Sequence, residues 1–316
     1  MDSKFFDIFI PSYHRADNCK TAIYYCKKVG WDVNKVHIFI DSEADDTAEY
    51  EQLAKRLGCQ LHIFDMMEAR ERYDYIHRAS VSRRSAGQAR NMMFDYAIAN
   101  GIDFYMVQDD DTQYYSIRFG NLTTKKAPVE SVKKQFFFMR DFMIKHHIGQ
   151  FGFSQGGDLI GGCGCGKVYR PKVMNTTFYN LKYIYRPERG VQDDDTSAFA
   201  GIMNEGLFCG SCRYGLILHQ TPSATSNGGL TDLYNECKLL NKALVVPIQF
   251  PSCVVAERQK GNGGRLHHKI NYRYLMPKIL RSINGRSNIA WDTYEEDYPF
   301  TNEPKRNKTI NFTLSF

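Results

Sequence analysis

Residues 86–111 read AGQARNMMFDYAIANGIDFYMVQDDD and contain the signals of a helix, a turn and a strand in direct succession. Apolar residues recur at helical spacing from Gln88 to Ala99, and Asn100 with Gly101 supplies a helix stop. The run from Asp103 to Gln108 is apolar enough for a buried strand, and three aspartates follow it. The stretch predicts a strand whose carboxyl end, the place where open α/β sheets bind ligands, carries clustered charge.

The sequence before this stretch alternates between strand and helix in the same way. Apolar runs predict strands at Phe5–Pro11, Lys35–Asp41 and Gln60–Phe64, and helical spacing predicts helices at Arg15–Val29 and Asp45–Leu57. Asp45 or Asp46 is the expected N-cap of the second helix, and Gly58 is its expected stop. This alternation predicts an α/β fold with a mostly parallel sheet flanked by helices.

The later part of the chain is less regular. A helix is expected at Glu130–His147, turns or close approach to a ligand in the glycine-rich residues 149–166, a helix at Thr196–Asn204 and a strand at Ala243–Phe250. We expect a catalytic domain over residues 1–240, with a nucleotide-binding half to about 112 and an acceptor half over 113–240. Residues 241–316 would form a C-terminal extension with a basic, glycine-rich loop, packed on the same domain.

Composition is that of a soluble globular protein, with 43% hydrophobic and 24% charged residues among 316. We find no apolar run of membrane-spanning length and no signal peptide, and therefore expect a cytoplasmic protein. Nine cysteines, an odd number, disfavour a disulfide framework. Two alternatives stay open for four of them, a structural zinc site or small buried side chains: Cys163, Cys165, Cys209 and Cys212.

Positive charge is unevenly distributed, although the net charge is only +6. Residues 258–286 contain eight lysines and arginines and no acidic residue, and residues 70–90 contain six arginines against two acidic residues. An anionic partner or a solvated surface would each account for these stretches.

The hexapeptide VQDDDT occurs twice, at residues 107–112 and 191–196. Adjacent carboxylates raise one another's pKa unless a cation or hydrogen-bond donors hold their charge. The first copy, at a strand end, suits Mg²⁺ or Mn²⁺ shared with substrate phosphates, with Asp109 and Asp111 as ligands. The second copy opens a helix, where one aspartate would serve as a cap and another as a general base. His219 is either a further metal ligand or a core histidine.

Taken together, these segments resemble the nucleotide-sugar glycosyltransferases of the GT-A fold. The similarity lies in IFIPSYHRADN (8–18), IFIDSEADDT (38–47), the stretch 86–111 and GVQDDDTSAF (190–199). In that family the first aspartate motif holds a divalent metal on the donor diphosphate. The later acidic motif supplies the catalytic base in inverting members.

The resemblance implies roles for individual residues. Asp109 and Asp110 would contact the donor, Asp109 and Asp111 the metal, and His219 would be the late histidine ligand. The base would be Asp193, or Asp194, because Gln192 stands where the family has glutamate. The remaining donor contacts implied are Pro11, Tyr13, Arg15 and Asp41 around the nucleoside and Arg90 near the diphosphate.

The twin acidic motifs and basic stretches are most similar to the branch associated with TET/JBP hydroxylases and with bacteriophage DNA hypermodification. That resemblance implies transfer of a sugar, from a UDP-sugar, to a hydroxymethylated pyrimidine such as hydroxymethylcytosine in DNA, in the host cytoplasm if the chain is phage-encoded. The DNA contacts would be Arg83, Arg84, Arg265, His267, His268 and Lys269.

Three alternatives remain at this stage. The same chemistry could act on a protein or glycan acceptor, because the donor half is common to many transferases. Six aspartates could also build a two-metal nuclease or nucleotidyltransferase. A nucleic-acid-binding module without activity would be hindered by so many carboxylates. The identity of the sugar and the oligomeric state are left open.

Overall fold

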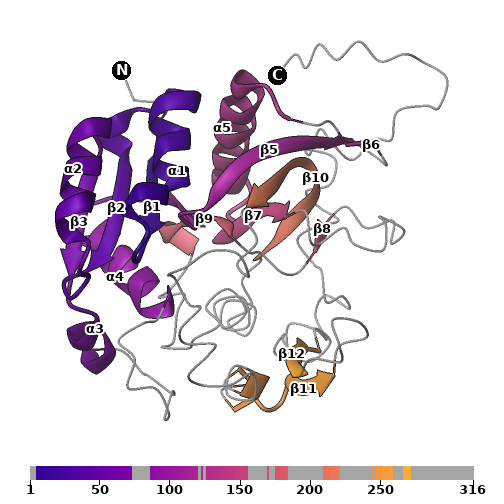
Figure 1. Cartoon of the computed structure of the whole chain (residues 1–316). Helices are drawn as coiled ribbons and strands as arrows, with labels where there is room; N and C mark the ends of the chain where they lie inside the picture. Colours follow the sequence, from indigo (N-terminus) through magenta and orange to yellow (C-terminus); the bar gives the residue numbers. More distant parts are fainter. Residues whose placement is uncertain are drawn as a thin grey trace, which may run out of the picture.

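The structure is a computed structural model that describes residues 5–72, 86–119, 122–123, 126–155, 169–170, 175–183, 209–220, 243–244, 246–248, 250–258 and 266–271. Within these residues a sheet of ten strands forms the centre of the molecule (Figure 1). One half of it is parallel, in the order β3 (Gln60–Phe64), β2 (Val36–Asp41), β1 (Asp7–Pro11) and β4 (Phe104–Gln108).

The other half of the sheet is mixed. β9 (Thr176–Asn180) is antiparallel to β4, β7 (Gln150–Gln155) is antiparallel to β9, and β10 (Cys209–Gln220) is parallel to β7. β5 (Thr112–Phe119) and β8 (Tyr169–Arg170) are antiparallel to β10, and β6 (Leu122–Thr123) is antiparallel to β5. The predicted α/β fold, with a mostly parallel sheet flanked by helices, is confirmed.

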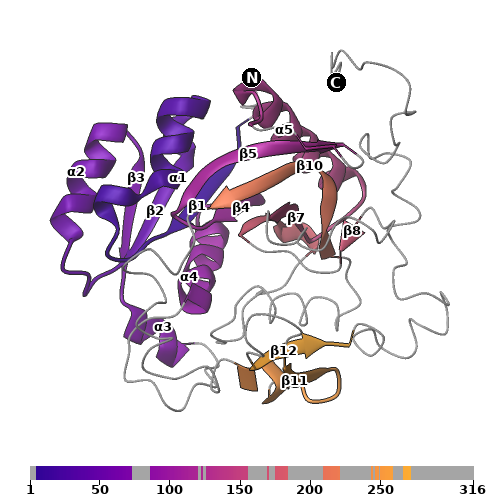
Figure 2. The same cartoon turned by 45° about the vertical axis from the view of Figure 1, so that its right-hand side comes forward.

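Helices cover both faces of this sheet because successive residues of a strand point to opposite sides. In β1, Ile8 and Ile10 join one core with residues of α2 (Thr47–Leu57) and α5 (Val129–Lys145), whereas Phe9 joins a second core with α4 (Ala86–Ala99). Figure 2 shows α4 on the side of the sheet away from α2 (Figure 2). Burial of each such side chain contributes roughly 1.5–3 kcal/mol.

The predicted elements of the parallel half agree with the structure to within two residues at each end, with one exception. The predicted helix Arg15–Val29 is divided into η1 (Ala16–Asn18), α1 (Lys20–Ile23) and the π-helical segment η2 (Tyr24–Val29). Gly58 ends α2 in the left-handed conformation, as expected. Asp46 occupies the N-cap position of α2, but its side chain makes no cap hydrogen bond and instead accepts from Ala16 N.

Two predictions for the later part were wrong. Residues 150–155, assigned to a turn-rich stretch, form β7, in which Phe151 and Phe153 are buried against Phe142 and Phe136 of α5. The predicted strand Ala243–Phe250 is helical at 243–244 and 246–248. A short apolar run has too few residues for its period to separate a buried strand from a buried helical turn.

A separate hairpin of β11 (Val254–Arg258) and β12 (Leu266–Ile270) lies within residues 241–316, which we expect to form a C-terminal extension. It lies at the opposite end of the molecule from α5 in both views (Figure 2). Val254 and Ile270 nevertheless belong to the same core as Phe9 and Tyr105 of the main sheet. In the part of the chain that the structure describes, no helix is both long and apolar enough to cross a membrane.

Candidate active site at the first aspartate triplet

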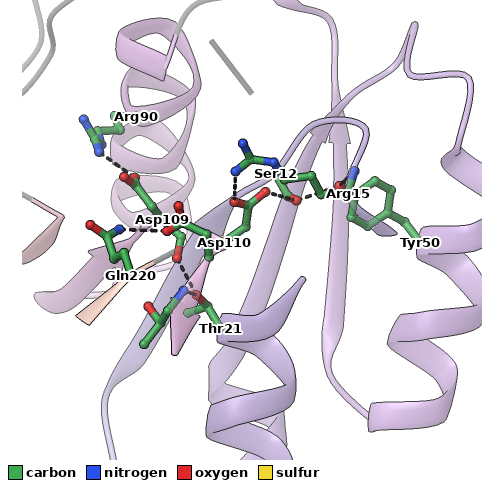
Figure 3. Close-up of polar contacts among 10 residues, drawn as sticks. Ser12, Arg15, Thr21, Tyr50, Arg90, Asp109, Asp110 and Gln220 are labelled. Atoms are coloured by element: carbon green, nitrogen blue, oxygen red, sulfur yellow. Dashed lines mark hydrogen bonds and ion pairs between the residues drawn. The ribbon is translucent and has the colours of Figure 1, made fainter. Parts of the chain in front are cut away.

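The residues Asp109, Asp110 and Asp111 connect β4 to β5 at the carboxyl edge of the parallel strands. The side chains of Asp109 and Asp110 point in different directions, Asp109 toward α4 and Asp110 toward the turn after β1 (Figure 3). Asp111 contacts the end of β10. Three neighbouring carboxylates therefore have three separate sets of partners.

Thr21, in the first turn of α1, holds the backbone of this connection. Its amide donates to Asp110 O at 3.1 Å, and its hydroxyl donates to Asp109 O and accepts from Thr112 N at 3.0 Å. Thr21 is completely buried. These contacts connect the first turn of α1 to the segment between β4 and β5.

Asp110 is enclosed by the protein's own groups. Its side chain is only 5% exposed, and it accepts hydrogen bonds from Ser12 Oγ at 2.6 Å and from Arg15 Nη1 at 2.7 Å. Tyr50 extends this arrangement with a hydroxyl 2.6 Å from Ser12 Oγ. Burial raises the pKa of the Asp110 carboxyl, while Arg15 and Ser12 act to lower it. Burial would lower the pKa of Arg15, but the aspartates of the triplet bring it above its ordinary value.

Asp109 is more accessible than Asp110, with 35% of its side chain exposed. Its carboxylate accepts from Arg90 Nη2 at 3.1 Å, and Arg90 is buried on α4. The predicted proximity of Arg90 to the triplet is thus present in the structure. An arginine held in this way can assist an anionic ligand bound beside Asp109.

Asp111 is held by a neutral group. Gln220, the last residue of β10, donates from Nε2 to Asp111 Oδ1 at 2.8 Å. Burial, together with the charges of Asp109 and Asp110, raises the pKa of Asp111 to about 7, and Gln220 acts in the opposite direction. A cation is the natural compensation for such a carboxylate.

Two further amides connect to Gln220. Asn175, which directly precedes β9, donates from Nδ2 to Gln220 Oε1 and to Gln155 Oε1, each at 2.6 Å. Gln155 is the last residue of β7. The three amides therefore form a continuous chain that starts at Asp111.

His219 is not directed at the triplet in this arrangement. Its Nε2 lies 2.8 Å from Ser116 Oγ, and its ring stacks on Tyr114 with centroids 4.5 Å apart. Burial lowers the pKa of His219, which favours the neutral ring. Among the described residues, the one group of three potential metal ligands with their atoms within 4.8 Å of one another is His14, Asp45 and Asp46.

The residues expected around the nucleoside lie near the ends of β1 and β2. Pro11 ends β1, and the ring of Tyr13 packs against His14 with centroids 3.8 Å apart. Asp41, at the end of β2, is buried, and its Oδ1 accepts from Met66 N at 3.2 Å at the start of α3 (Met66–Arg72). The structure thus brings these predicted residues to one edge of the sheet.

Seven other predicted residues lie outside the described part of the chain, namely Asp193, Asp194, Arg83, Arg84, Arg265, Cys163 and Cys165. Three more are described only in their backbone, namely His267, Cys209 and Cys212. His268, a predicted DNA contact, is buried in the hairpin, with 8% of the residue exposed. In an antiparallel hairpin its side chain alternates with that of Lys269. Lys269 is exposed and pairs with Glu257 at 2.8 Å.

Several residues of the site were missed by sequence reasoning. They are polar residues in otherwise apolar segments: Ser12, Thr21, Gln155, Asn175 and Gln220. A usable signal existed for Gln220, since it follows the apolar run GLIL together with His219. The adjacent His219 was assigned as the metal ligand instead. The pairing of β10 with β5 shifts register between His219 and Gln220.

Solved glycosyltransferases are similar to this chain in structure at low sequence identity. The mannosyltransferase PcManGT from Pyrobaculum calidifontis, in complex with GDP-Man and Mn²⁺, has 11% identity and a TM-score of 0.48 over 78% of this chain and 63% of that one. TarS 1–349 from S. aureus, in complex with UDP-GlcNAc, has 12% identity and a TM-score of 0.40 over 77% and 66%. This chain thus spans less than two thirds of either.

Glucosyl-3-phosphoglycerate synthase from Mycobacterium tuberculosis, in a complex with Mn²⁺ and UDP-Glc, has 10% identity and a TM-score of 0.43 over 84% and 86%. Comparison with curated proteins gives no match. Residues 6–211, about two thirds of the chain and the part that contains both aspartate motifs, match the family model of the TET-associated glycosyltransferases, and the chain belongs to that glycosyltransferase family.

Proposed function

We propose that this glycosyltransferase moves a sugar from a nucleotide sugar, held with a divalent metal, to the hydroxyl of a hydroxymethylated pyrimidine in DNA. The observation that carries the proposal is the division of labour within the triplet. Asp110 is buried against Arg15, whereas Asp109 and Asp111 flank it at the edge where α/β sheets bind ligands. Family membership supports glycosyl transfer over the nuclease alternative.

The donor set of the site fits Mg²⁺ or Mn²⁺. Both ions prefer oxygen ligands, and they use one or two carboxylates together with phosphate oxygens. Asp109 and Asp111 would provide those carboxylates, because a carboxylate has two oxygens and can accept several contacts at once. Bound there, the ion would neutralise charge on the diphosphate as the glycosidic bond breaks. His219 would join only if its ring left Ser116.

Charge at the site supports the same conclusion. The three aspartates carry a formal −3 when ionised, and Arg15 with Arg90 supplies +2, which leaves −1. A nucleotide diphosphate adds further negative charge, so donor binding is unfavourable without a cation. Arg90, on the α4 side, would contact the diphosphate, and Pro11, Tyr13 and Asp41, near the ends of β1 and β2, would hold the nucleoside. We infer a UDP-sugar as donor.

The acceptor half of the reaction rests on the family and on the second acidic motif. A carboxylate of Asp193 or Asp194 takes the proton of the acceptor hydroxyl, and the oxygen attacks the anomeric carbon. The bond from that carbon to the diphosphate oxygen breaks, and its electron pair leaves with the nucleoside diphosphate. One displacement inverts the anomeric configuration.

The association of the family with TET proteins supports a modified base in DNA as the acceptor. Exposed Lys269, with Arg83, Arg84, Arg265 and His267, would contact phosphates. We place the donor half at residues 1–112, the acceptor half at 113–240, and a C-terminal extension at 241–316, and we place the reaction in the cytoplasm. A protein or glycan acceptor remains the competing outcome.

Mass spectrometry of DNA tests this proposal. Duplex DNA containing hydroxymethylcytosine is incubated with the chain, Mn²⁺ and a panel of nucleotide sugars, and the nucleosides are analysed after digestion. A mass gain of one hexose or pentose on hydroxymethylcytosine, absent with unmodified cytosine DNA and with EDTA, is the expected result. Release of UDP without any gain on DNA would move the acceptor to another class.

DNA retention gives an independent measure of the acceptor. A DNA-acting enzyme should bind duplex DNA at low salt, with affinity that falls steeply as salt rises, because phosphate contacts release counterions. Absence of duplex binding at low salt would contradict a DNA acceptor while leaving donor chemistry untouched.

A further inference from the structure

We propose that Asn175 and Gln220 form an amide relay that orients the Asp111 carboxylate for metal binding. They are positioning residues, because neither is assigned contact with donor or acceptor. The inference rests on the proposed function, in which Asp111 is a metal ligand. In this inference the residue at the end of β10 that supports the metal site is Gln220, which contacts Asp111, whereas the sequence had pointed to His219.

The sheet topology brings these side chains together. β4, β7 and β10 run in the same direction, so the triplet, Gln155 and Gln220 lie at one edge. β9 runs in the opposite direction, and therefore its start, next to Asn175, lies at this edge as well. Three strands thus deliver one amide each to the side of the triplet away from Arg15.

The hydrogen bonds of Asn175 hold Gln220 in one orientation, the same one that the Asp111 carboxylate requires as an acceptor. An amide NH₂ has two hydrogens, and Asn175 donates one to Gln155 Oε1 and the other to Gln220 Oε1. Because the oxygen of Gln220 is turned toward Asn175, its NH₂ faces the other way and donates to Asp111 Oδ1. Asn175 thereby determines that Asp111 meets a donor and not an acceptor.

The backbone of Asn175 adds a second constraint. Its φ is +63°, in the left-handed region that few side chains other than asparagine and aspartate adopt readily. This conformation belongs to the residue that turns the chain into β9. Asparagine therefore meets two requirements at one position, namely a left-handed backbone and an NH₂ group aimed at two acceptors.

A neutral relay suits the role of Asp111. A lysine or arginine in place of Gln220 would neutralise the carboxylate and weaken its attraction for a cation. A glutamine fixes the carboxylate through one oxygen and leaves its charge in place. Partners of metal ligands commonly contribute about 10- to 100-fold in metal affinity.

The experiment compares Asn175→Asp, Asn175→Gly and wild type in the full chain by titration with Mn²⁺, with free Mn²⁺ measured by electron paramagnetic resonance. Asn175→Asp preserves the left-handed backbone but cannot donate, so Gln220 turns its NH₂ to residue 175 and its oxygen to Asp111. Asn175→Gly preserves the backbone and removes the relay. Asn100→Asp, an exposed site at the far end of α4, is the matched charge control.

The relay predicts that Mn²⁺ binding weakens about 10- to 100-fold in Asn175→Asp and less in Asn175→Gly. The sign is informative, because an added carboxylate acting only through space would tighten cation binding. Melting temperatures without Mn²⁺ should stay close to wild type, and the KM for Mn²⁺ in transfer should rise more than kcat falls.

Unchanged or tighter Mn²⁺ binding in Asn175→Asp overturns the relay, as does Asn175→Gly with wild-type affinity. If the wild-type chain binds Mn²⁺ and Asp111→Asn does not, that failure concerns the relay alone. If the wild-type chain binds no Mn²⁺, the proposed metal site and the relay fall together.

Discussion

The two sides of the aspartate triplet are built from different chemistry. On the side of β1 and α4, charged residues hold the carboxylates, with Arg15 on Asp110 and Arg90 on Asp109. On the side of β7, β9 and β10, neutral amides lead to Asp111. The charged side fixes a buried carboxylate in place, whereas the amide side orients a carboxylate without removing its charge.

This difference gives each aspartate a distinct role. Asp110, enclosed by Arg15, Ser12 and the residues behind them, connects the triplet to the turn after β1 and serves the architecture. Asp111 has a pKa raised to about 7 and accepts a hydrogen bond from the neutral Gln220. Binding of a cation would stabilise the ionised form of this carboxylate. Three identical residues are thus separated by their neighbours.

The largest expected effect concerns the proposed catalytic base in the second acidic motif. Loss of this base would separate its chemical role from the metal-binding and structural roles of the first triplet. We expect either Asp193→Asn or Asp194→Asn to lower kcat by about 10²- to 10⁴-fold, the usual contribution of a general base. Donor and Mn²⁺ binding should change little in the same variant. Steady-state transfer assays with both variants measure this, and two variants within a few-fold of wild type would remove the base assignment.

The next effect tests the charged side. Arg15→Met should lower the free energy of unfolding by about 3–5 kcal/mol, because it leaves Asp110 buried without its partner. Urea unfolding without donor or metal measures the loss. The double variant Arg15→Met with Asp110→Asn should recover much of it. A loss below about 1 kcal/mol in Arg15→Met, within the range of exposed ion pairs, would contradict the role given to this pair.

A smaller effect separates the two sides by their response to acid. The parallel half of the sheet, which carries the charged side of the triplet, also contains a histidine network. In it, His37 Nε2 lies 2.9 Å from Asp7 Oδ1 and His37 Nδ1 lies 2.9 Å from His62 Nε2. Burial, with a contribution from His37, lowers the pKa of His62 to about 4, and the unfolded chain titrates near 6.5. A lowered histidine pKa means that protonation favours unfolding, so stability is lost as pH falls from about 6.5 to about 4.

Urea unfolding at pH 7 and at pH 4.5 tests this window in wild type and in His62→Phe, which keeps a ring against Tyr96. The fall in unfolding free energy toward acid should be smaller in the variant. Equal falls in unfolding free energy in both proteins would show that acid destabilises the protein through groups other than His62. The difference in acid response between the two sides of the triplet would then be unsupported.

The same comparison shows what could be predicted from sequence. The parallel half follows from local signals, because each strand is succeeded by its own helix and Asp109 to Asp111 follow β4 directly. The mixed half depends on pairing between strands that are distant in sequence. Asn175 lies 20 residues from Gln155 and 45 from Gln220, and only the order β9, β7, β10 brings them together.

Chemistry was predictable where charge marked it. The triplet was identified because clustered aspartates are unusual, and Arg90 was identified through the family resemblance. The structure brings them together. Gln220 carries no charge, and its neighbour His219 is a common metal ligand, so the sequence pointed to His219, whereas Gln220 is the residue that contacts Asp111. The irregular pairing that skips Gln113 of β5, between the strand partners of His219 and Gln220, cannot be read from the run GLILHQ.

The central claim is that Asp111 binds the donor metal, whereas Asp110 stabilises the fold through its contacts with Arg15 and Ser12. Calorimetric titration of Mn²⁺ in the presence of UDP, with wild type and Asp111→Asn matched for melting temperature, tests it most directly. The account predicts clear Mn²⁺ binding by wild type and binding at least about tenfold weaker in the variant. Equal Mn²⁺ affinity in the two proteins would contradict it.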